Sequence, residues 1–78
     1  MRVVGTLQKH PKIGTTVFFM NEKYIVKFEA GNMEQTFKFS TDIAPDLAAV
    51  DLLLTEDFIS KVFHRFNDMY LSVPVWEK

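Results

Sequence analysis

The stretch Thr15–Ser40, with the sequence TTVFFMNEKYIVKFEAGNMEQTFKFS, decides the fold. Apolar and polar residues alternate along it almost without a break, except at Asn21-Glu22 and Gly31-Asn32, where turn-forming residues interrupt the pattern. Alternation with a period of two residues between such turns is typical of strands joined by hairpins. The stretch therefore predicts an antiparallel meander of three strands.

A fourth strand is expected before this meander. The segment Val3–Gln8 is β-branched in part, and Pro11, which cannot donate a hydrogen bond to a neighbouring strand, follows it in a natural turn. The sequence therefore predicts three to four strands. The expected strands are Val3–Gln8, Ile13–Met20, Lys23–Ala30 and Met33–Ser40.

Two-residue turns would set the register of the meander. They place Val17 opposite Val26 and Val26 opposite Phe37, so that both turns bring the same apolar residues to one face. Glu22 fits poorly at a turn position with positive φ, and a wider loop is the alternative there. The face that we expect to form the core carries Val17, Phe19, Tyr24, Val26, Phe28, Met33, Phe37 and Phe39.

After the last strand, apolar residues recur with helical spacing. Thr41 or Asp42 can cap a short first helix that has Pro45 in its first turn. Thr55 can cap a longer second helix over Glu56–Tyr70, whose first-turn carboxylates favour the helix dipole. The apolar stripes are Ile43, Leu47, Val50, Leu53 and Leu54 in the first helix, and Phe58, Ile59, Val62, Phe63, Phe66, Met69 and Tyr70 in the second.

These elements predict an α+β fold in a single domain, residues 1–78. An antiparallel meander over residues 3–40 is packed on one face by a short helix and a C-terminal amphipathic helix over residues 42–70, in the order ββββαα. Residues 71–78 form a tail, because Pro74 bars continuation of the helix. Of the 78 residues, 47% are hydrophobic and eight are Phe, as expected of a globular protein.

The composition excludes several classes of function. The chain has no cysteine, which excludes disulfides, thiolate metal ligands and cysteine nucleophiles. No apolar run follows a basic start as in a signal peptide. The longest apolar stretch, residues 47–54, is interrupted by Asp51 and is too short to span a bilayer. We expect a cytoplasmic protein without a membrane partner.

The sequence contains no pattern of a catalytic or metal site. His10 and His64 have no neighbour at metal-ligand spacing, and neither a Gly-rich phosphate loop nor a G-x-S-x-G motif is present. The acidic residues near the first helix are explained as caps and solvated side chains. We therefore expect no enzyme, no catalytic residue, no metal and no cofactor.

Two polar features of the meander stand out. Gln35 falls on the expected core face opposite Phe28, where its amide must find a partner. We expect that partner to be the backbone of the N-terminal segment or of a helix, and a small-ligand pocket beside Tyr24 is the alternative. Glu29 and Glu34 face each other on the other side, where opposed like charges are mildly unfavourable.

The charges of the chain are distributed unevenly. Residues 1–40 carry six basic and three acidic residues, whereas residues 41–78 carry three basic and seven acidic ones. Such a two-sided distribution can orient an encounter with a partner or with a second copy, although ordinary solvated surface explains it as well.

The opposite face of the expected sheet is partly apolar. Two helices that both follow the meander can cover only one face, and an apolar patch left on the other usually marks an interface. A second copy of the chain, the tail residues 73–76 or single-stranded nucleic acid could cover it. The residues expected there are Thr16, Phe18, Met20, Lys23, Ile25, Lys27, Thr36 and Lys38, with Val3 and Leu7 if the first strand pairs in the sheet.

The leading hypothesis is a small non-enzymatic protein-interaction module that self-associates, as a homodimer, through this uncovered face or the sheet edge. The alternative is a single-stranded nucleic-acid-binding domain in which lysines contact phosphates and Phe18 stacks on a base. The slightly acidic net charge and the lack of an RNP motif disfavour the alternative. The candidate partner-binding residues are Phe18, Met20, Ile25, Lys27, Lys38 and Trp76.

Most of the chain resembles a family of short, uncharacterised bacterial proteins. The resemblance rests on MNEKYIVKFEAGNMEQTFKF at Met20–Phe39 and on FISKVFHRFNDM at Phe58–Met69, and VVGTLQKHP at Val3–Pro11 fits it as well. Many members have Gly where this chain has Glu22. Because the shared motifs are structural, the resemblance implies the fold and no activity.

Overall fold

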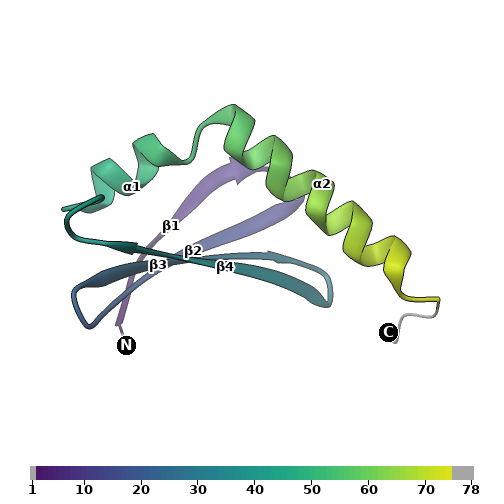
Figure 1. Cartoon of the computed structure of the whole chain (residues 1–78), viewed down its shortest axis with the longest axis horizontal. Coiled ribbons are helices and arrows are strands. Elements are labelled where there is room, and N and C mark those ends of the chain that lie inside the picture. The colour runs from purple at the N-terminus through teal and green to yellow at the C-terminus, as the bar shows by residue number, and fades with distance from the viewer. Residues whose placement is uncertain (1, 75–78) are drawn as a thin grey trace.

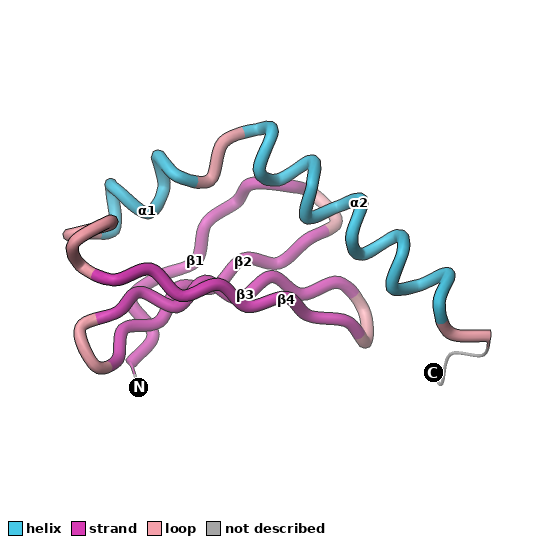
Figure 2. Tube along the Cα trace, viewed as in Figure 1, coloured by secondary structure: helices cyan, strands magenta, loops and turns pink. Residues whose placement is uncertain are grey.

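The computed structural model of the chain describes residues 2–74. Four strands form one antiparallel sheet in the order β1-β2-β3-β4, and two helices follow them (Figure 1). Both helices lie over the same face of the sheet, and the predicted α+β fold with the order ββββαα is confirmed (Figure 2). The elements are β1 Arg2–His10, β2 Ile13–Met20, β3 Lys23–Ala30, β4 Met33–Ser40, α1 Leu47–Leu53 and α2 Glu56–Ser72.

The strands β2, β3 and β4 begin and end at the predicted residues. Val17 pairs with Val26, and Val26 pairs with Phe37, so the predicted register is confirmed. Since side chains alternate between the two sides of a strand, this register collects the apolar residues of three strands on one face. We call this face, which carries Val17 and Val26, the core face, and the opposite one, which carries Phe18 and Ile25, the far face.

Both hairpin turns of the meander have two residues. Asn21 and Glu22 adopt positive φ angles of 52° and 59°, which is the arrangement of a type I′ turn and matches the twist of the flanking strands. The wider loop considered at Glu22 is therefore wrong. In the second turn the positive φ of 61° falls on Gly31, the first of the two central residues, as in a type II′ turn.

β1 is longer than predicted and pairs irregularly with β2. Val3 lies opposite Phe18, but one extra residue, Val4, shifts the pairing so that Leu7 lies opposite Thr15. An extra residue in one strand moves the later side chains to the other face. The expectation that Leu7 lies on the far face is therefore wrong, and its side chain packs against the core.

α1 begins later than predicted. Its N-cap is Asp46, whose carboxylate accepts a hydrogen bond of 2.8 Å from the Ala49 amide, so the expected cap at Thr41 or Asp42 is wrong. The physical reason is Pro45, because the ring of a proline disfavours a helical conformation of the residue before it. A helix capped at Thr41 or Asp42 would need Ala44 in the helical conformation, so the proline excludes that start.

The chain between β4 and α1 forms a turn. The amides of Ile43 and Ala44 donate hydrogen bonds of 3.0 and 2.9 Å to the carbonyl of Ser40. Ala44 is fully buried, whereas Ile43 is mostly exposed and does not belong to the apolar stripe in which it was expected. The buried side chains that α1 and its C-cap contribute to the core are Val50 and Leu54.

α2 is the longest element of the structure. Thr55 caps it as predicted, since its hydroxyl accepts a hydrogen bond of 3.2 Å from the Phe58 amide. The helix ends at Ser72, two residues later than predicted, and Val73 is extended before Pro74. Within residues 2–74, no helix has both the length and the apolar character that crossing a membrane requires.

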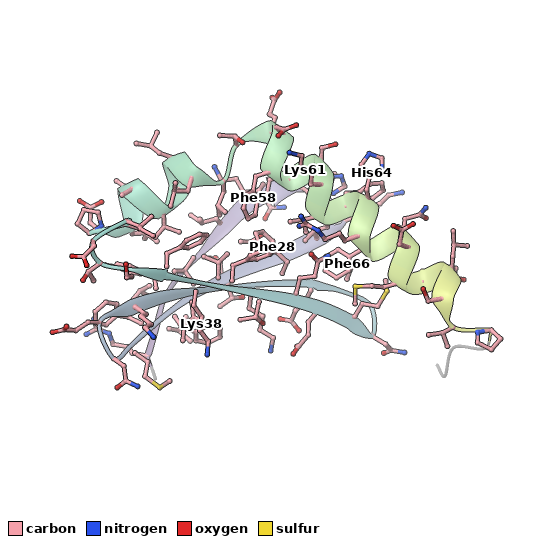
Figure 3. All side chains as sticks on the ribbon, in the orientation of Figure 1. Phe28, Lys38, Phe58, Lys61, His64 and Phe66 are labelled. Carbon is pink, nitrogen blue, oxygen red and sulfur yellow. The ribbon has the colours of Figure 1, made fainter. Side chains whose placement is uncertain are left out.

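The core lies between the core face and the inner sides of the helices (Figure 3). Phe28 is fully buried, and the centroid of its ring lies 5.7 Å from that of Phe37 and 6.0 Å from that of Phe58. The rings of Phe37 and Phe58 are 5.1 Å apart and meet edge to face, a favourable arrangement. The three rings join β3, β4 and α2 into one unit.

An ion pair also connects α1 to β1. The ammonium of Lys9 contacts the carboxylate of Asp51 and lies 3.4 Å from the carbonyl oxygen of the same residue. Both side chains are partly exposed, and such pairs contribute little net free energy. The contact therefore orients α1 over the sheet more than it stabilises the fold.

Replacing Glu22 with glycine should stabilise the protein. A side chain costs about 1–2 kcal/mol in the left-handed conformation, but glycine also gives the unfolded chain more freedom. We expect the free energy of unfolding to rise by about 0.5–1 kcal/mol, measured by urea denaturation. Glu22→Ala is the matched control, because it keeps the Cβ atom and should unfold like the original protein. A less stable Glu22→Gly variant would contradict the left-handed turn.

Candidate interaction surfaces

Neither helix covers the far face, on the side of the sheet opposite to both helices (Figure 1). Its side chains form rows across the strands, because residues paired in the register share a face. In Figure 3, Lys38 extends from this face away from the helices. One row is largely apolar and consists of Val3, Phe18, Ile25 and Lys38. The next row is polar and consists of Thr6, Thr16, Lys27 and Thr36.

Five of the six predicted contact residues lie together on the far face. They are Phe18, Met20, Ile25, Lys27 and Lys38. Phe18 and Met20 are half-buried, and Lys38 is exposed. The sixth, Trp76, lies outside the described residues. The far face thus brings together apolar and basic side chains.

Ile25 offers almost no contact area, because only 6% of it is exposed. Phe18 and Lys38 flank it in its row, and lysines stand two residues before and after it on β3. Neighbours on the same face therefore bury this side chain without a helix above it. The accessible apolar area of the row comes from Phe18, which is half-buried, and from Val3, which is 59% exposed.

The charges on the far face are separated along the strands. Lys23 and Lys38 are exposed toward one end, and Glu29 and Glu34 are exposed toward the other. The predicted pairing of Glu29 with Glu34 is confirmed. Lys27 relieves the repulsion between them, since its ammonium lies 3.3 Å from the Glu34 carboxylate. Lys27 is therefore already paired with a carboxylate of the same chain.

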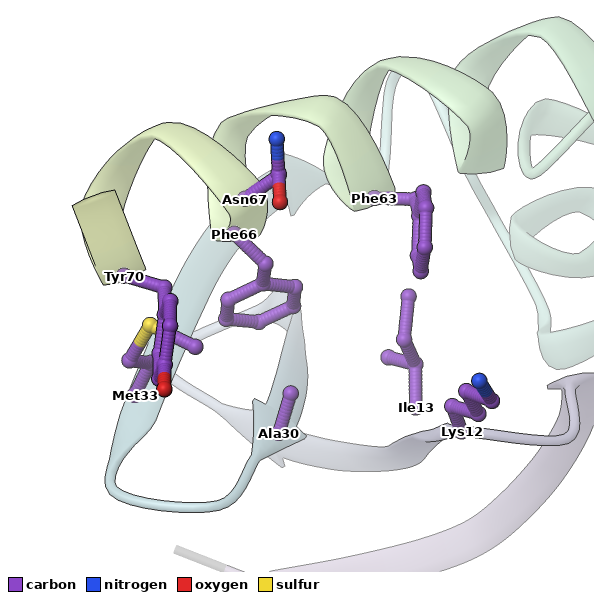
Figure 4. A pocket seen from close by; sticks show the side chains of 8 residues that line it. All are labelled: Lys12, Ile13, Ala30, Met33, Phe63, Phe66, Asn67 and Tyr70. Carbon is purple, nitrogen blue, oxygen red and sulfur yellow. The ribbon is translucent and has the colours of Figure 1, made fainter.

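A groove lies on the helix side of the sheet, between the second half of α2 and the ends of β2, β3 and β4 (Figure 4). Its volume is about 220 Å³. Ile13 and Phe66 are buried at its base, whereas Phe63 and Tyr70 are 40% and 55% exposed at its border. A hollow of about 190 Å³ also borders Tyr70 beside the β3–β4 turn. Part of the predicted apolar side of α2 thus lines a groove at the surface.

Both histidines contact the same ring of α2. The ring of His10 stacks on Phe63 with centroids 5.0 Å apart, and its Nδ1 accepts a hydrogen bond of 3.1 Å from the Lys12 amide. His64 meets Phe63 edge to face at 6.3 Å and lies on the outer side of α2 (Figure 3). In the part of the chain that the structure describes, no three metal-ligating side chains gather at one place.

Two polar side chains of the core face differ in whether they form a hydrogen bond. The side-chain amide of Gln35 donates a hydrogen bond of 3.0 Å to the Val62 carbonyl, which confirms the predicted bond to a helix backbone. Thr15 is 3% exposed, and its hydroxyl has no partner among the described residues. Its neighbour Thr16 lies on the far face and is only partly buried, because the helices cover the core face alone.

Comparison of the chain with protein-family models, with curated protein sequences and with solved structures gave no match. The resemblance to short bacterial proteins therefore stays a prediction.

Ile25 and Val3 should respond differently to truncation, although they share a row. Ile25→Ala leaves a cavity under packed neighbours, and we expect the free energy of unfolding to fall by about 2 kcal/mol. Val3→Ala, the matched control at an exposed site, should change it by less than about 0.5 kcal/mol. Urea denaturation at low protein concentration measures both. Equal effects would show that Ile25 is not packed as described.

Proposed function

We propose that this protein is a small, non-enzymatic interaction module that self-associates through the far face. The observation that carries the proposal is the apolar row on a sheet face that neither helix covers, in which Val3 and Phe18 supply the accessible area. An apolar patch left open on a sheet commonly marks an interface. Burying it against another surface contributes about 25 cal/mol for each Å² of apolar area.

The charges of the far face favour a second copy as the occupant. Lys23 is exposed at one end of β3, and Glu29 is exposed six residues further on, about 20 Å away along the strand. Two far faces can meet about a two-fold axis that runs across the strands. Lys23 of each copy then lies over Glu29 of the other, and a two-fold interface makes each such contact twice.

The same axis places Phe18 near the centre of the interface. The midpoint between Lys23 and Glu29 is Val26, which pairs with Val17, and Phe18 is the next residue along β2. A few residues near the centre of an interface contribute most of its binding free energy, and aromatic side chains are common among them. The opposite charges and the aromatic anchor therefore support one and the same arrangement.

Single-stranded nucleic acid is the alternative occupant, and the far face favours it less. Lys27 is paired with Glu34, and Glu29 adds a second exposed carboxylate. Phe18 is the one aromatic residue that β1–β4 place on this face within residues 2–74. Stacking platforms combine several aromatic rings with a basic groove. Binding of short single strands that weakens steeply with salt would favour this alternative.

The proposal includes a cytoplasmic location and no catalytic role. A chain without cysteine is suited to a reducing compartment. The sequence also lacks the nucleophile and phosphate-loop motifs that would point to a reaction. The resemblance to short bacterial proteins adds no activity to this interpretation.

Phe18→Lys should give a folded protein that self-associates at least tenfold more weakly, which corresponds to about 1.4 kcal/mol. The reason is that the substitution replaces the central apolar anchor with a charge. Sedimentation equilibrium of the full chain over a range of concentrations measures the association. Leu52→Lys is the matched control, because Leu52 is exposed on α1 and away from the far face. A strictly monomeric original protein, or an unfolded Phe18→Lys variant, would contradict the proposal.

The same experiment can test the orientation of the two copies. Lys23→Glu should weaken association, because it sets two carboxylates over each other. Combining it with Glu29→Lys restores opposite charges between the copies and should restore association. If the double variant associates as weakly as the single one, the two-fold axis across the strands is wrong.

A further inference from the structure

The groove beside α2 is a second apolar surface, on the side of the sheet opposite to the far face. We propose that it is the binding site for the C-terminal residues 75–78 of the same chain, with the indole of Trp76 packed in the groove against Tyr70 and Met33. The sequence hypothesis instead considered the tail as a cover for the far face. The two placements differ in which surface stays open to a partner.

The size and lining of the groove suit one indole ring. A cavity of about 150 Å³ lined by apolar side chains binds benzene, and the groove offers about 220 Å³. Ile13 and Phe66 supply a buried apolar base, and Tyr70 stands beside Met33 (Figure 4). Contacts of an aromatic ring with another ring and with a thioether sulfur are both favourable.

The tail is long enough to reach this place. The described chain ends at Pro74, four residues after Tyr70, and the helix itself ends only about 3 Å beyond Tyr70. Val73 is extended, with φ of −107° and ψ of 121°, so the chain leaves the helix axis at this point. Trp76 follows Pro74 by two residues, which span at most about 7 Å. Its long side chain covers the remaining distance.

The length and charge of the groove also match the tail. Phe63 and Tyr70 border it about 10 Å apart along α2, and four extended residues span at most about 14 Å. Lys12 lies at the end away from Tyr70 (Figure 4). Within residues 2–74 its ammonium has no ion-pair partner. Glu77 directly follows Trp76, so a tail running back along α2 carries a carboxylate toward this lysine.

The position of α2 favours the groove over the far face. α2 lies over the core face, and its C-terminal end extends past the turn that joins β3 and β4 (Figure 1). The tail follows directly on α2, which packs against the core face. To reach Phe18 the tail would have to pass around the sheet, whereas Tyr70 lies only four residues before Pro74 in the chain. A tail in the groove therefore leaves the far face open.

Fluorescence of Trp76 tests the proposal directly, because it is the single tryptophan of the chain. Excitation at wavelengths where tyrosine does not absorb reports on this residue alone. In the folded full-length protein we expect emission at shorter wavelength than in the urea-unfolded chain, and several-fold slower quenching by acrylamide. Both values should stay constant on dilution, because the contact lies within one chain.

Variants of the groove and matched controls locate the contact. Tyr70→Lys and Met33→Lys, on the helix and sheet sides of the groove, should each move the emission toward that of the unfolded chain. Circular dichroism verifies that both variants remain folded. Because the two substitutions lie on different elements, the test still works if one of the variants does not fold. Leu71→Lys, next to Tyr70 and exposed outside the groove, and Phe18→Lys on the far face should leave the emission unchanged.

Each other outcome overturns the proposal. Emission equal to that of the unfolded chain would place the indole in solvent. If Phe18→Lys shifts the emission and Tyr70→Lys does not, the tail lies on the far face. That result would also contradict the proposed dimer. A short-wavelength emission that is lost on dilution would show burial between two copies, which leaves the dimer standing and removes the intrachain contact.

Discussion

The packing of Phe28 against Phe37 and Phe58 is the interaction on which the rest of the structure depends. These rings connect two strands of the sheet to the first turn of α2, and Phe28 among them is fully buried. The bond from Gln35 to the Val62 carbonyl fixes the helix one turn further on. The Arg65 guanidinium, 6.0 Å from the centroid of Phe37, covers the cluster from outside. The direction of α2 across the sheet follows from these contacts.

A helix anchored near its start must separate from a sheet that twists beneath it. Strands of a sheet rotate relative to one another, whereas a helix without Gly or Pro stays nearly straight. Ile59, Val62 and Phe66 are accordingly buried, but Tyr70 and Leu71 are largely exposed at the far end of α2. The groove beside α2 is the space that this separation opens. The groove lies on the opposite side of the sheet from the apolar row. The chain therefore has two separate surfaces, and each can bind a different segment or partner.

Much of the fold could be predicted because hairpins depend on residues that are close in sequence. The bounds and register of β2, β3 and β4 follow from alternation and two-residue turns, and the cap of α2 at Thr55 follows from local hydrogen bonding. The errors have physical causes of their own. The bulge at Val4 turns the side chain of Leu7 to the core face. Pro45 moves the cap of α1 to Asp46. Glu22 occupies a left-handed position that its side chain disfavours, because the twist of the hairpin requires it.

For the candidate site, the sequence by itself determined which side chains of β2, β3 and β4 share the far face, since alternation along strands that pair without a bulge allows no other arrangement. Only the tertiary structure decided how much of each residue is accessible. Phe18 and Ile25 are equivalent in the alternating pattern, yet one remains accessible and the other is packed by its neighbours. The groove was not foreseen, because it depends on the angle between α2 and the sheet. That angle is set by contacts such as the packing of Phe28 against Phe58 and the bond from Gln35 to the Val62 carbonyl, and side chains so far apart in sequence leave no periodic signal of their contact.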